Sequence, residues 1–407
     1  MSLIRSWVES ANAPGTQFPL NNLPCGVFSE AGEGRKRRGI AIGEMIFDVT
    51  KAAAEGLVPA LDLARGGAAE WNGFMALGPG TWQAFREALT GILCEDAAAR
   101  PDLLVPQAGA RLHMPFDVTE YTDFYASRHH ATNVGTMFRG AENALPPNWL
   151  HIPIGYNGRA SSVVVSGTEV RRPWGQLKFP GDDTPVFAPS ARFDIELELG
   201  AIVGQASGGP VSVDRADEMI FGYVLLNDWS ARDIQAWEYQ PLGPFQSKAT
   251  ATSISPWIVT KAALEPFRRM PPARELPLLP HLRDTGPMLY DIDLSVDLNG
   301  ERICRTNYAE MYYSAAQQLA HHTSCGCPMR VGDLLGSGTI SGPQRDARGS
   351  LLEITSGGKE LLMLSDGSTR AFLEDRDRIS LQGSARGDGY LIGFGECSGT
   401  LVPATEP

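Results

Sequence analysis

The 407-residue chain lacks the features that mark several specialised classes of protein. Its six cysteines are too sparse for a disulfide scaffold, so we expect reduced thiols. Its apolar runs are far shorter than the roughly 18 residues of a membrane-spanning helix, and the first segment, MSLIRSWVESANAPG, has no apolar signal-peptide core. We therefore expect a cytoplasmic protein without a membrane partner.

Positive charge is also scarce, with 35 Lys and Arg against 47 Asp and Glu, a formal net charge of −12. This balance disfavours a protein that tracks nucleic-acid phosphates. The glycine-dense segments GSGTISG and GDGYLIGFG lack the GxGxxG spacing of a dinucleotide-binding turn. The excess carboxylates could instead serve a hard cation such as calcium or magnesium.

The pattern of residues predicts a β-rich protein of two domains. The 44 glycines and 29 prolines favour many turns between short strands. We place the boundary between residues 1–115 and residues 116–407, because His, aromatic, Arg and Asp residues become dense in loops from there onward. The strand-like segments are GIAIGEMIFDVT, SSVVVSG, FDIELELGAIVG, YDIDLSVDLNG and LLEITSGG, and helices are expected near residues 81–99, 227–239 and 308–321.

The segment LLNDWSARDIQAWEYQPLGPF carries a polar stripe if it is helical. At about 100° per residue, Asp228, Arg232, Gln235 and Tyr239 fall on one narrow face that could point into a cavity. The alternative is a solvated surface with an Asp228–Arg232 ion pair of little energetic weight. The segment by itself leaves both interpretations open.

Acidic residues alternate with apolar ones in FDIELELG. Glu196 and Glu198 share a strand face, with Asp194 beside them, and such carboxylates repel one another unless they are solvated, protonated or bridged by a cation. A plain amphipathic strand with an acidic outer face is the simpler interpretation of this segment taken alone.

The loop-rich segment EYTDFYASRHHATNVGTMFRG gathers Asp123, Tyr125, His129, His130 and Arg139. Loops carry functional residues more often than their share of the chain would suggest. Because adjacent histidines on a regular strand point apart, we expect only one of the two to serve a site.

These segments resemble the fumarylacetoacetase (fumarylacetoacetate hydrolase) family over essentially the full length, from FPLNNLPCGVF to GFGECSGTLVPA. The resemblance rests on separated blocks, namely YTDFYASRHHATNVGTMFRGAENALPPNWLHIPIGYNGRASSVVVSG, IELELG, NDWSARDIQAWEYQPLGPFQSK, GDLLGSGTISGP and GDGYLIGFGEC. The N-terminal match distinguishes the chain from relatives that share only the catalytic domain.

The resemblance implies roles for individual residues. His130 stands where the family has its general base and Glu353 where it has the partner of that imidazole. The other implied roles are metal binding by Asp123, Glu196, Glu198 and Asp228, a second magnesium position at Asp228, Lys248 and Thr252, carbanion stabilisation by Arg232, Gln235 and Lys248, and substrate contact by Tyr125, Arg139, Tyr156, Gln235, Tyr239 and Thr339.

The resemblance also implies a fold, a reaction and an assembly. The fold is a small N-terminal SH3-like barrel followed by a mixed β-sandwich roll, and the assembly is a homodimer. The reaction is the Ca²⁺- or Mg²⁺-dependent hydrolysis of a small diketo acid at a carbon–carbon bond, the last step of tyrosine catabolism. Two departures from the family pattern are Asn157 and Ala251, the latter beside the second metal position.

Two alternatives remain open at this stage. The chain could be a hydrolase, hydratase or decarboxylase of another β-diketo or 2-keto acid, or a catalytically silent calcium-binding protein. The presence of His130 and Glu353 beside the carboxylates speaks against the second, because ion binding alone has no use for a water-activating pair.

Overall fold

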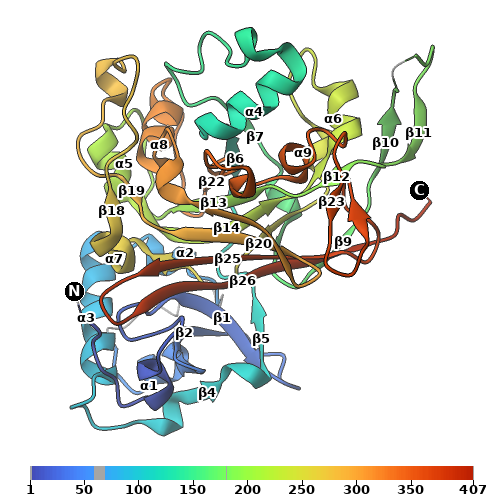
Figure 1. Ribbon diagram of the computed structural model, residues 1–407. Coiled ribbons are helices and arrows are strands. Elements are labelled where there is room, and N and C mark those ends of the chain that lie inside the picture. The colour runs from blue at the N-terminus through green and yellow to red at the C-terminus, as the bar shows by residue number, and fades with distance from the viewer. Residues whose placement is uncertain (1, 59–68, 180, 407) are drawn as a thin grey trace.

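A computed structural model describes residues 2–58, 69–179 and 181–406. The N-terminal part carries one antiparallel five-stranded sheet in the order β4-β3-β2-β1-β5, flanked by helices (Figure 1). The strands are β1 (Cys25–Glu30), β2 (Arg37–Ile42), β3 (Met45–Asp48), β4 (Leu104–Pro106) and β5 (Ala110–His113), and the helices are α1 (Val49–Ala54), α2 (Asn72–Met75) and α3 (Pro79–Leu93). The helix expected near residues 81–99 is therefore confirmed, although it ends at Leu93.

The larger part of the chain is organised around an eight-stranded mixed sheet. Its order is β7-β6-β22-β13-β14-β16-β8, and β17 also pairs with β14. The members are β6 (Tyr121–Phe124), β7 (Gly155–Asn157), β8 (Val163–Val165), β13 (Leu197–Val203), β14 (Ile220–Asp228), β16 (Thr252–Ile254), β17 (Val259–Thr260) and β22 (Leu334–Gly336). Segments far apart in the sequence meet here, since β22 lies between β6 and β13.

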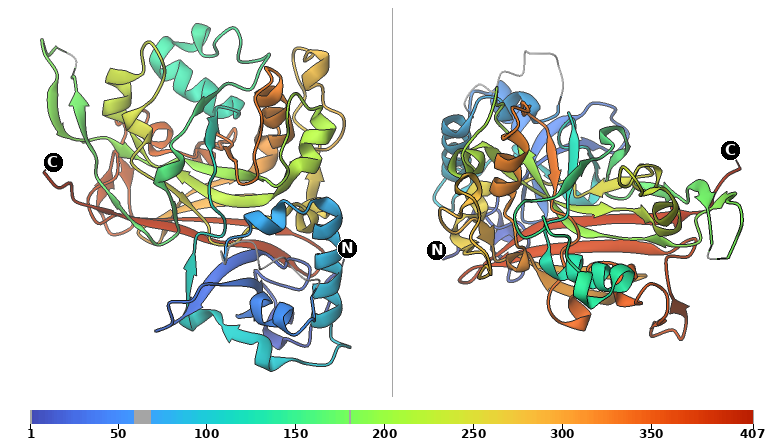
Figure 2. Two further views of the ribbon diagram at one scale, coloured as in Figure 1. Left: turned by 180° about the vertical axis from the view of Figure 1, so that it is seen from behind. Right: turned by 90° about the horizontal axis from the view of Figure 1, so that it is seen from above.

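A second five-stranded sheet, β21-β20-β25-β26-β9, shares a hydrophobic core with the eight-stranded sheet, and its long strands β25 and β26 cross the middle of the view in Figure 1. Its strands are β9 (Glu169–Arg171), β20 (Asp293–Leu298), β21 (Glu301–Asn307), β25 (Arg378–Arg386) and β26 (Leu391–Val402). The remaining strands form two-stranded pairs: β10 (Trp174–Leu177) with β11 (Val186–Pro189), β12 (Phe193–Asp194) with β15 (Ser230–Ala231), β18 (Arg268–Arg269) with β19 (Leu289–Tyr290), and β23 (Leu362–Met363) with β24 (Thr369–Arg370). The β10–β11 hairpin projects from the body beside the C-terminus in both views of Figure 2.

Helices accompany the sheets of the larger part, with α4, α6 and α8 on the side away from the N-terminal part and α7 next to α3 (Figure 1). They are α4 (Arg128–Arg139), α5 (Val213–Met219), α6 (Arg232–Glu238), α7 (Lys261–Leu264), α8 (Ala315–Thr323) and α9 (Leu351–Ile354). The arrangement confirms the expected β-rich α+β class. None of the helices within the described residues combines the length and apolarity needed to cross a bilayer.

The eight-stranded sheet separates two hydrophobic cores. On β14, Tyr223 and Leu225 pack into the core of the catalytic part, whereas Val224 and Leu226 pack into a core shared with the N-terminal sheet. Because successive residues of a strand face opposite sides, one strand serves both cores. The N-terminal part is thereby held against the sheet by apolar contacts.

Several expectations about secondary structure are wrong in whole or in part, among them the loop-rich segment around His130, of which Arg128–Arg139 is the helix α4. The helix expected at 227–239 starts only at Arg232, because the apolar run before it is a buried strand, β14, that continues to Asp228. A strand buried on both faces reads as a continuous apolar run, which periodicity cannot separate from a helix. Asp228 therefore lies at a strand end and not on a helical stripe with Tyr239.

The segment LLEITSGG is the short helix α9, not a strand. Ser350 caps it by accepting a hydrogen bond from the Glu353 N–H, and the chain leaves it through left-handed residues at Ser356 and Gly357. The helix expected at 308–321 is a 3₁₀ turn at Tyr308–Glu310 followed by α8, which Ser314 and Gln317 start with a reciprocal capping box.

Candidate active site

Four carboxylates from three parts of the chain converge at one end of the eight-stranded sheet. One oxygen from each of Asp123, Glu196, Glu198 and Asp228 lies within 4.8 Å of the others, and all four side chains are buried. Asp123 is on β6, Glu198 is on β13, and Asp228 ends β14, while Glu196 precedes β13. The interpretation of FDIELELG as a strand with a solvated acidic face is therefore wrong.

The sheet register explains how these residues meet. Gly336 of β22 pairs with Asp123 on one side and with Gly200 on the other, so β22 separates two carboxylate-bearing strands. A Cβ atom at Gly336 would lie 3.0 Å from both Asp123 Oδ1 and Glu198 Oε2. Glycine at this position thus leaves the space into which the two carboxylates point.

Burial and mutual repulsion shift the protonation of the cluster. Burial, reinforced by Asp228, raises the pKa of Asp123 well above its ordinary value, and burial together with Asp123 does the same for Glu198. Burial alone would also raise the pKa of Glu196, but Lys248 and Arg232 outweigh it and lower that pKa. Without a cation, the cluster holds protons at a pH where ordinary carboxyl groups have lost them.

Two basic side chains close one side of the cluster. Lys248 Nζ donates to Glu196 and, at 2.7 Å, to Asp228 Oδ2, and Arg232 forms a 2.7 Å ion pair with Glu196 Oε1. Thr252 Oγ1 lies 3.3 Å from Asp228 Oδ1. Arg232, Lys248 and Thr252, which were predicted to border the carboxylates, therefore lie next to them. Lys248 contacts the carboxylates by donating hydrogen bonds from its ammonium group.

His130 and Glu353 form a buried hydrogen-bonded pair. The Nδ1 atom of His130 is 2.6 Å from Glu353 Oε2, and the two side chains are 5% and 0% exposed. His130 is in the first turn of α4, where Ser127 caps the helix. Burial would raise the pKa of Glu353, but His130 and hydrogen bonds from Asn133 and Ser341 lower it below its ordinary value.

Several residues around Glu353 were not predicted from the sequence. Asn133 Nδ2 donates to Glu353 Oε1 at 2.9 Å, and the hydroxyls of Ser341 and Ser350 each donate to Oε2 at 2.9 Å. Asn133 could have been found, because it follows His130 by three residues and so shares its helical face. The serines carry no such signal, since their approach to Glu353 depends on the tertiary fold.

Asp194 binds Arg232 and caps α9. It is fully buried, its Oδ2 accepts a 2.8 Å hydrogen bond from Arg232 Nε, and its two oxygens accept from the N–H groups of Leu351 and Leu352. Burial raises the pKa of Asp194, whereas Arg232 and the α9 amides favour its ionised form.

The predicted substrate-contacting residues lie at different distances from the carboxylate cluster and the His130–Glu353 pair. The ring of Tyr125 lies edge-on to the His130 imidazole with centroids 5.3 Å apart, and the Tyr156 hydroxyl is 3.5 Å from Asp228 Oδ2. Arg139 sits at the end of α4, where it donates to the Asn143 and Ala144 carbonyl oxygens. Its charge lowers the pKa of Tyr125 against the larger upward effect of burial.

Gln235, Tyr239 and Thr339 complete the predicted set. Gln235 Oε1 accepts from Arg232 Nη1 at 3.2 Å, which ties it to the basic side of the cluster. Thr339 is 1% exposed and its hydroxyl has no hydrogen-bond partner within the described part of the chain. Tyr239 caps the far end of α6 with 48% of its surface exposed, about 10 Å along the helix axis from Arg232.

The carboxylate cluster fits a hard divalent cation. Asp123 Oδ1 and Glu198 Oε1 are buried and have no hydrogen-bond partner among the described residues. A buried carboxylate oxygen without a partner is costly, and an all-oxygen donor set without thiolate suits calcium or magnesium better than zinc. Asp123, Glu196, Glu198 and Asp228 could therefore hold a metal ion.

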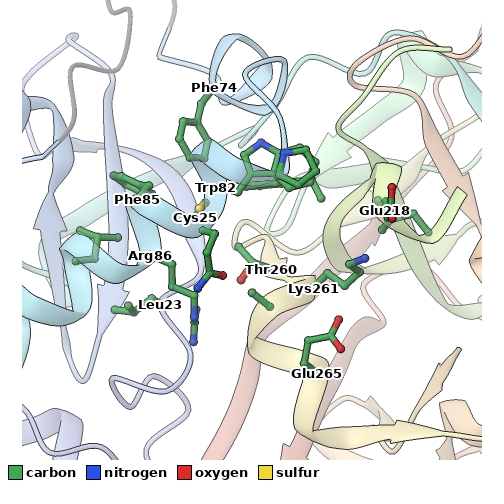
Figure 3. A pocket seen from close by; sticks show the side chains of 16 residues that line it. Leu23, Cys25, Phe74, Trp82, Phe85, Arg86, Glu218, Thr260, Lys261 and Glu265 are labelled. Atoms are coloured by element: carbon green, nitrogen blue, oxygen red, sulfur yellow. The ribbon is translucent and has the colours of Figure 1, made fainter. Parts of the chain in front are cut away.

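A separate cavity of about 240 Å³ lies between α3 and the segment that follows β17 (Figure 3). Trp82 and Arg86 of α3 face Thr260 and Lys261 across it, and burial lowers the pKa of Arg86 to about 10. None of the predicted site residues lines this cavity, so it is distinct from the carboxylate centre.

A buried carboxylate cluster beside an imidazole–carboxylate pair is the arrangement of a hydrolytic enzyme centre. The chain belongs to the fumarylacetoacetate hydrolase family. The family model for the fumarylacetoacetate hydrolase C-terminal region matches residues 119–402, and the model for the fumarylacetoacetase N-terminal region matches residues 21–115.

Curated relatives match over nearly their whole length. The chain is 46% identical to fumarylacetoacetase of Homo sapiens, covering 97% of this chain and 98% of that protein, and 44% identical to fumarylacetoacetase of Arabidopsis thaliana, covering 99% and 100%. Among solved structures, a fumarylacetoacetate hydrolase from Exiguobacterium antarcticum aligns with a TM-score of 0.55 at 16% identity, covering 94% of this chain and 100% of that one. The last match shows the shared fold.

Proposed function

We propose that this protein hydrolyses 4-fumarylacetoacetate to fumarate and acetoacetate, the last step of tyrosine and phenylalanine (homogentisate) catabolism. The observation that carries the proposal is the convergence of the four carboxylates and the His130–Glu353 pair in a chain of this family. Full-length identity of 46% to a curated fumarylacetoacetase supports the same substrate.

His130 is the group that activates water. Its Nδ1 is bound to Glu353, which leaves Nε2 to accept a proton from a water molecule as the oxygen attacks the ketone carbonyl carbon of the fumaryl group, the one attached to the C=C bond. Histidine suits this role because its ordinary protonation equilibrium lies near neutral pH. Glu353 fixes the orientation of the ring and stabilises the imidazolium that forms, as the acid of a hydrolase triad does.

The leaving group needs stabilisation because it departs as a carbanion. When the bond between the attacked carbon and the adjacent CH₂ breaks, the electron pair stays on the acetoacetate fragment as an enolate, which then takes up the proton from His130. Arg232, Gln235 and Lys248 supply donors for this developing negative charge. Removal of one such donor typically costs about 10²-fold or more in rate.

We further propose that Asp123, Glu196, Glu198 and Asp228 bind Ca²⁺ or Mg²⁺, with a second magnesium position bordered by Asp228, Lys248 and Thr252. When bound, the ion supplies Lewis-acid polarisation of the diketone oxygens. Tyr125, Arg139, Tyr156, Gln235, Tyr239 and Thr339 bind the substrate, whose two carboxylates need cationic and hydroxyl partners of the kind that Arg139, Tyr125 and Tyr156 offer.

The remaining proposals concern organisation. The domain boundary falls near residues 115–116, between β5 and β6. Six free thiols are compatible with a cytoplasmic location. A homodimer is supported by exposed apolar side chains, since Phe187 on β11 is 58% exposed and Leu242 and Phe245, in the segment after α6, are 95% and 75% exposed. Light scattering coupled to size exclusion should report twice the mass of one chain.

The substrate assignment is tested by measuring product formation from fumarylacetoacetate and from a series of acylpyruvates. We expect fumarate and acetoacetate in equal amounts, with kcat/KM for fumarylacetoacetate at least about 10²-fold above that for any acylpyruvate. A preference for an acylpyruvate would reassign the protein to another keto-acid hydrolase with this fold, and absence of turnover with all of them would refute the proposal.

A further inference from the structure

Asp194 contacts two parts of the site, Arg232 and the start of α9. It lies on β12, whose pairing with β15 sets it opposite Ser230, two residues before Arg232. Its oxygens reach Arg232 on one side and the first turn of α9 on the other. It is fully buried, so these contacts are not shared with solvent.

The Asp194 carboxylate accepts four hydrogen bonds within the described part of the chain. Oδ1 accepts from the N–H groups of Ile195 at 2.7 Å and Leu351 at 2.8 Å, and Oδ2 accepts from Leu352 N–H at 3.0 Å and Arg232 Nε at 2.8 Å. Only an ionised carboxylate offers acceptors at both oxygen positions. An asparagine of the same shape would turn its NH₂ group toward at least one of these donors.

The contact with Arg232 links Asp194 to the carboxylate cluster. With Nε held by Asp194, the guanidinium of Arg232 presents Nη2 to Glu196 Oε1 at 2.7 Å and Nη1 to Gln235 Oε1 at 3.2 Å. A guanidinium is a rigid planar fork, so fixing one edge fixes the direction of the others. Asp194 thereby sets where the positive charge of Arg232 points.

The contact with α9 links Asp194 to the His130 imidazole. Asp194 holds the Leu351 and Leu352 amides at the start of α9, and Glu353 is the next residue in the same turn. Glu353 in turn holds His130 Nδ1 at 2.6 Å. A shift of the start of α9 would move the partner that orients the imidazole.

We propose that Asp194 is a positioning residue that keeps Arg232 and the His130–Glu353 pair in one fixed arrangement. It therefore couples the group that activates water to a group that stabilises the leaving carbanion. The inference rests on the proposed function for its turnover readout, whereas its structural readout is independent of the substrate.

Asp194→Asn is the direct test, and Asp233→Asn is its matched control. Asp233 is also buried and accepts from Ser190 Oγ and from the N–H groups of Ala191 and Arg192, but these contacts lead to neither α9 nor the Arg232 guanidinium. We expect Asp194→Asn to lower kcat by about 10- to 100-fold, as loss of a supporting hydrogen bond around a site does, with KM within about threefold. Asp233→Asn should keep kcat within about threefold.

The structural readout is the ring proton on His130 Nδ1, whose short hydrogen bond to Glu353 places it far downfield in the proton NMR spectrum. It is assigned by its absence from His130→Gln. Asp194→Asn should shift or abolish this resonance, and Asp233→Asn should leave it in place. An unmoved resonance, or a kcat no lower than that of Asp233→Asn, would overturn the proposal.

A second pair of variants tests one of the two hydrogen bonds between Asp194 and α9 without changing Asp194. Leu351→Pro deletes the N–H that Asp194 accepts, at the first helical position, where proline fits and where Ser350 already has an extended backbone. Leu351→Ala removes the same side-chain packing and keeps the N–H. We expect kcat of Leu351→Pro to be at least about fivefold below that of Leu351→Ala. Equal kcat values would contradict the proposal that Asp194 acts through α9. If the wild type proved inactive on fumarylacetoacetate, a shifted His130 resonance in Asp194→Asn would still support the positioning role.

Discussion

At the scale of single residues, His130 carries the sharpest expectation. Replacement by Gln keeps a side chain of similar polarity but removes the base, so kcat should fall by at least about 10³-fold, within the usual range for positioned proton transfer. Metal content should stay near that of the wild type, because His130 is not among the clustered carboxylates. The thermal unfolding midpoint should fall, because buried Glu353 loses its imidazole partner. His129→Gln is the control, since that ring is one-third exposed and faces Glu310. Near-normal turnover in His130→Gln would remove the base from the proposal.

Glu353 makes the stability contribution of the His130–Glu353 pair depend on pH. Its pKa is lower in the folded protein than its ordinary value, so the folded state favours the ionised form. Its contribution is therefore present above the unfolded-state pKa of about 4.3 and is lost as the pH falls through the lower folded value. Glu353→Gln removes one partner of a buried pair, which typically costs about 3 kcal/mol near neutral pH.

The pH dependence is measured by urea unfolding of both proteins from pH 7 to about pH 2, because the loss begins only below the unfolded-state pKa of about 4.3. The difference in unfolding free energy between wild type and Glu353→Gln should shrink toward the acid end. Glu360→Gln, at an exposed ion pair with Arg345, should change stability by at most about 1 kcal/mol at any of these values. A difference that does not vary with pH would show that Glu353 is not ionised in the folded protein.

At the scale of elements, β22 determines the room available for the cluster. Gly336→Ala would bring a methyl group to 3.0 Å from oxygens of Asp123 and Glu198, inside ordinary contact distance. We expect cation affinity to fall by at least about tenfold and turnover to fall with it, because those oxygens must move apart. Calorimetric titration of the chelator-treated protein with Ca²⁺ and with Mg²⁺ measures the first effect.

Gly91→Ala provides the contrast, because Gly91 lies on α3 with no atom within 4 Å of an added Cβ. A glycine-to-alanine change inside a helix usually stabilises by about 0.5–1 kcal/mol, so this variant should bind the cation normally and melt slightly higher. Normal cation binding by Gly336→Ala would show that the cluster adapts and that β22 does not set its size.

Elements also show how far sequence reasoning reaches. The two-residue spacing of Glu196 and Glu198 correctly indicates one shared side, and the residue types alone indicate an oxygen-lined centre. The prediction that Asp228 lies on a helix is wrong, because a short, fully buried strand and a buried helix can have the same apolar pattern. The segment LLEITSGG predicts a strand because its apolar residues are followed by the turn-forming residues Ser356, Gly357 and Gly358. Glu353 is instead on the short helix α9. Its pairing with His130 rested on family resemblance, since no local periodicity relates residues so distant in sequence.

At the scale of the whole molecule, the carboxylate cluster predicts a large effect of metal removal. Treatment with EDTA should abolish turnover and lower the unfolding midpoint, because uncompensated buried carboxylates repel one another and a ligand that binds only the folded state stabilises it. Readdition of Ca²⁺ or Mg²⁺ should restore both properties. A rate that survives complete chelation would show that the cation has no catalytic role.

The parallel pairings of the central sheet have a consequence for biogenesis. The strand β22 enters between β6 and β13 only after most of the chain has been synthesised, and it is the strand that brings Asp123 alongside Glu198. No shorter nascent fragment can present the complete set of ligands, and such long-range pairings form slowly. We therefore expect cation binding to occur late in folding, and the metal content of a preparation should then report the fraction of correctly folded molecules.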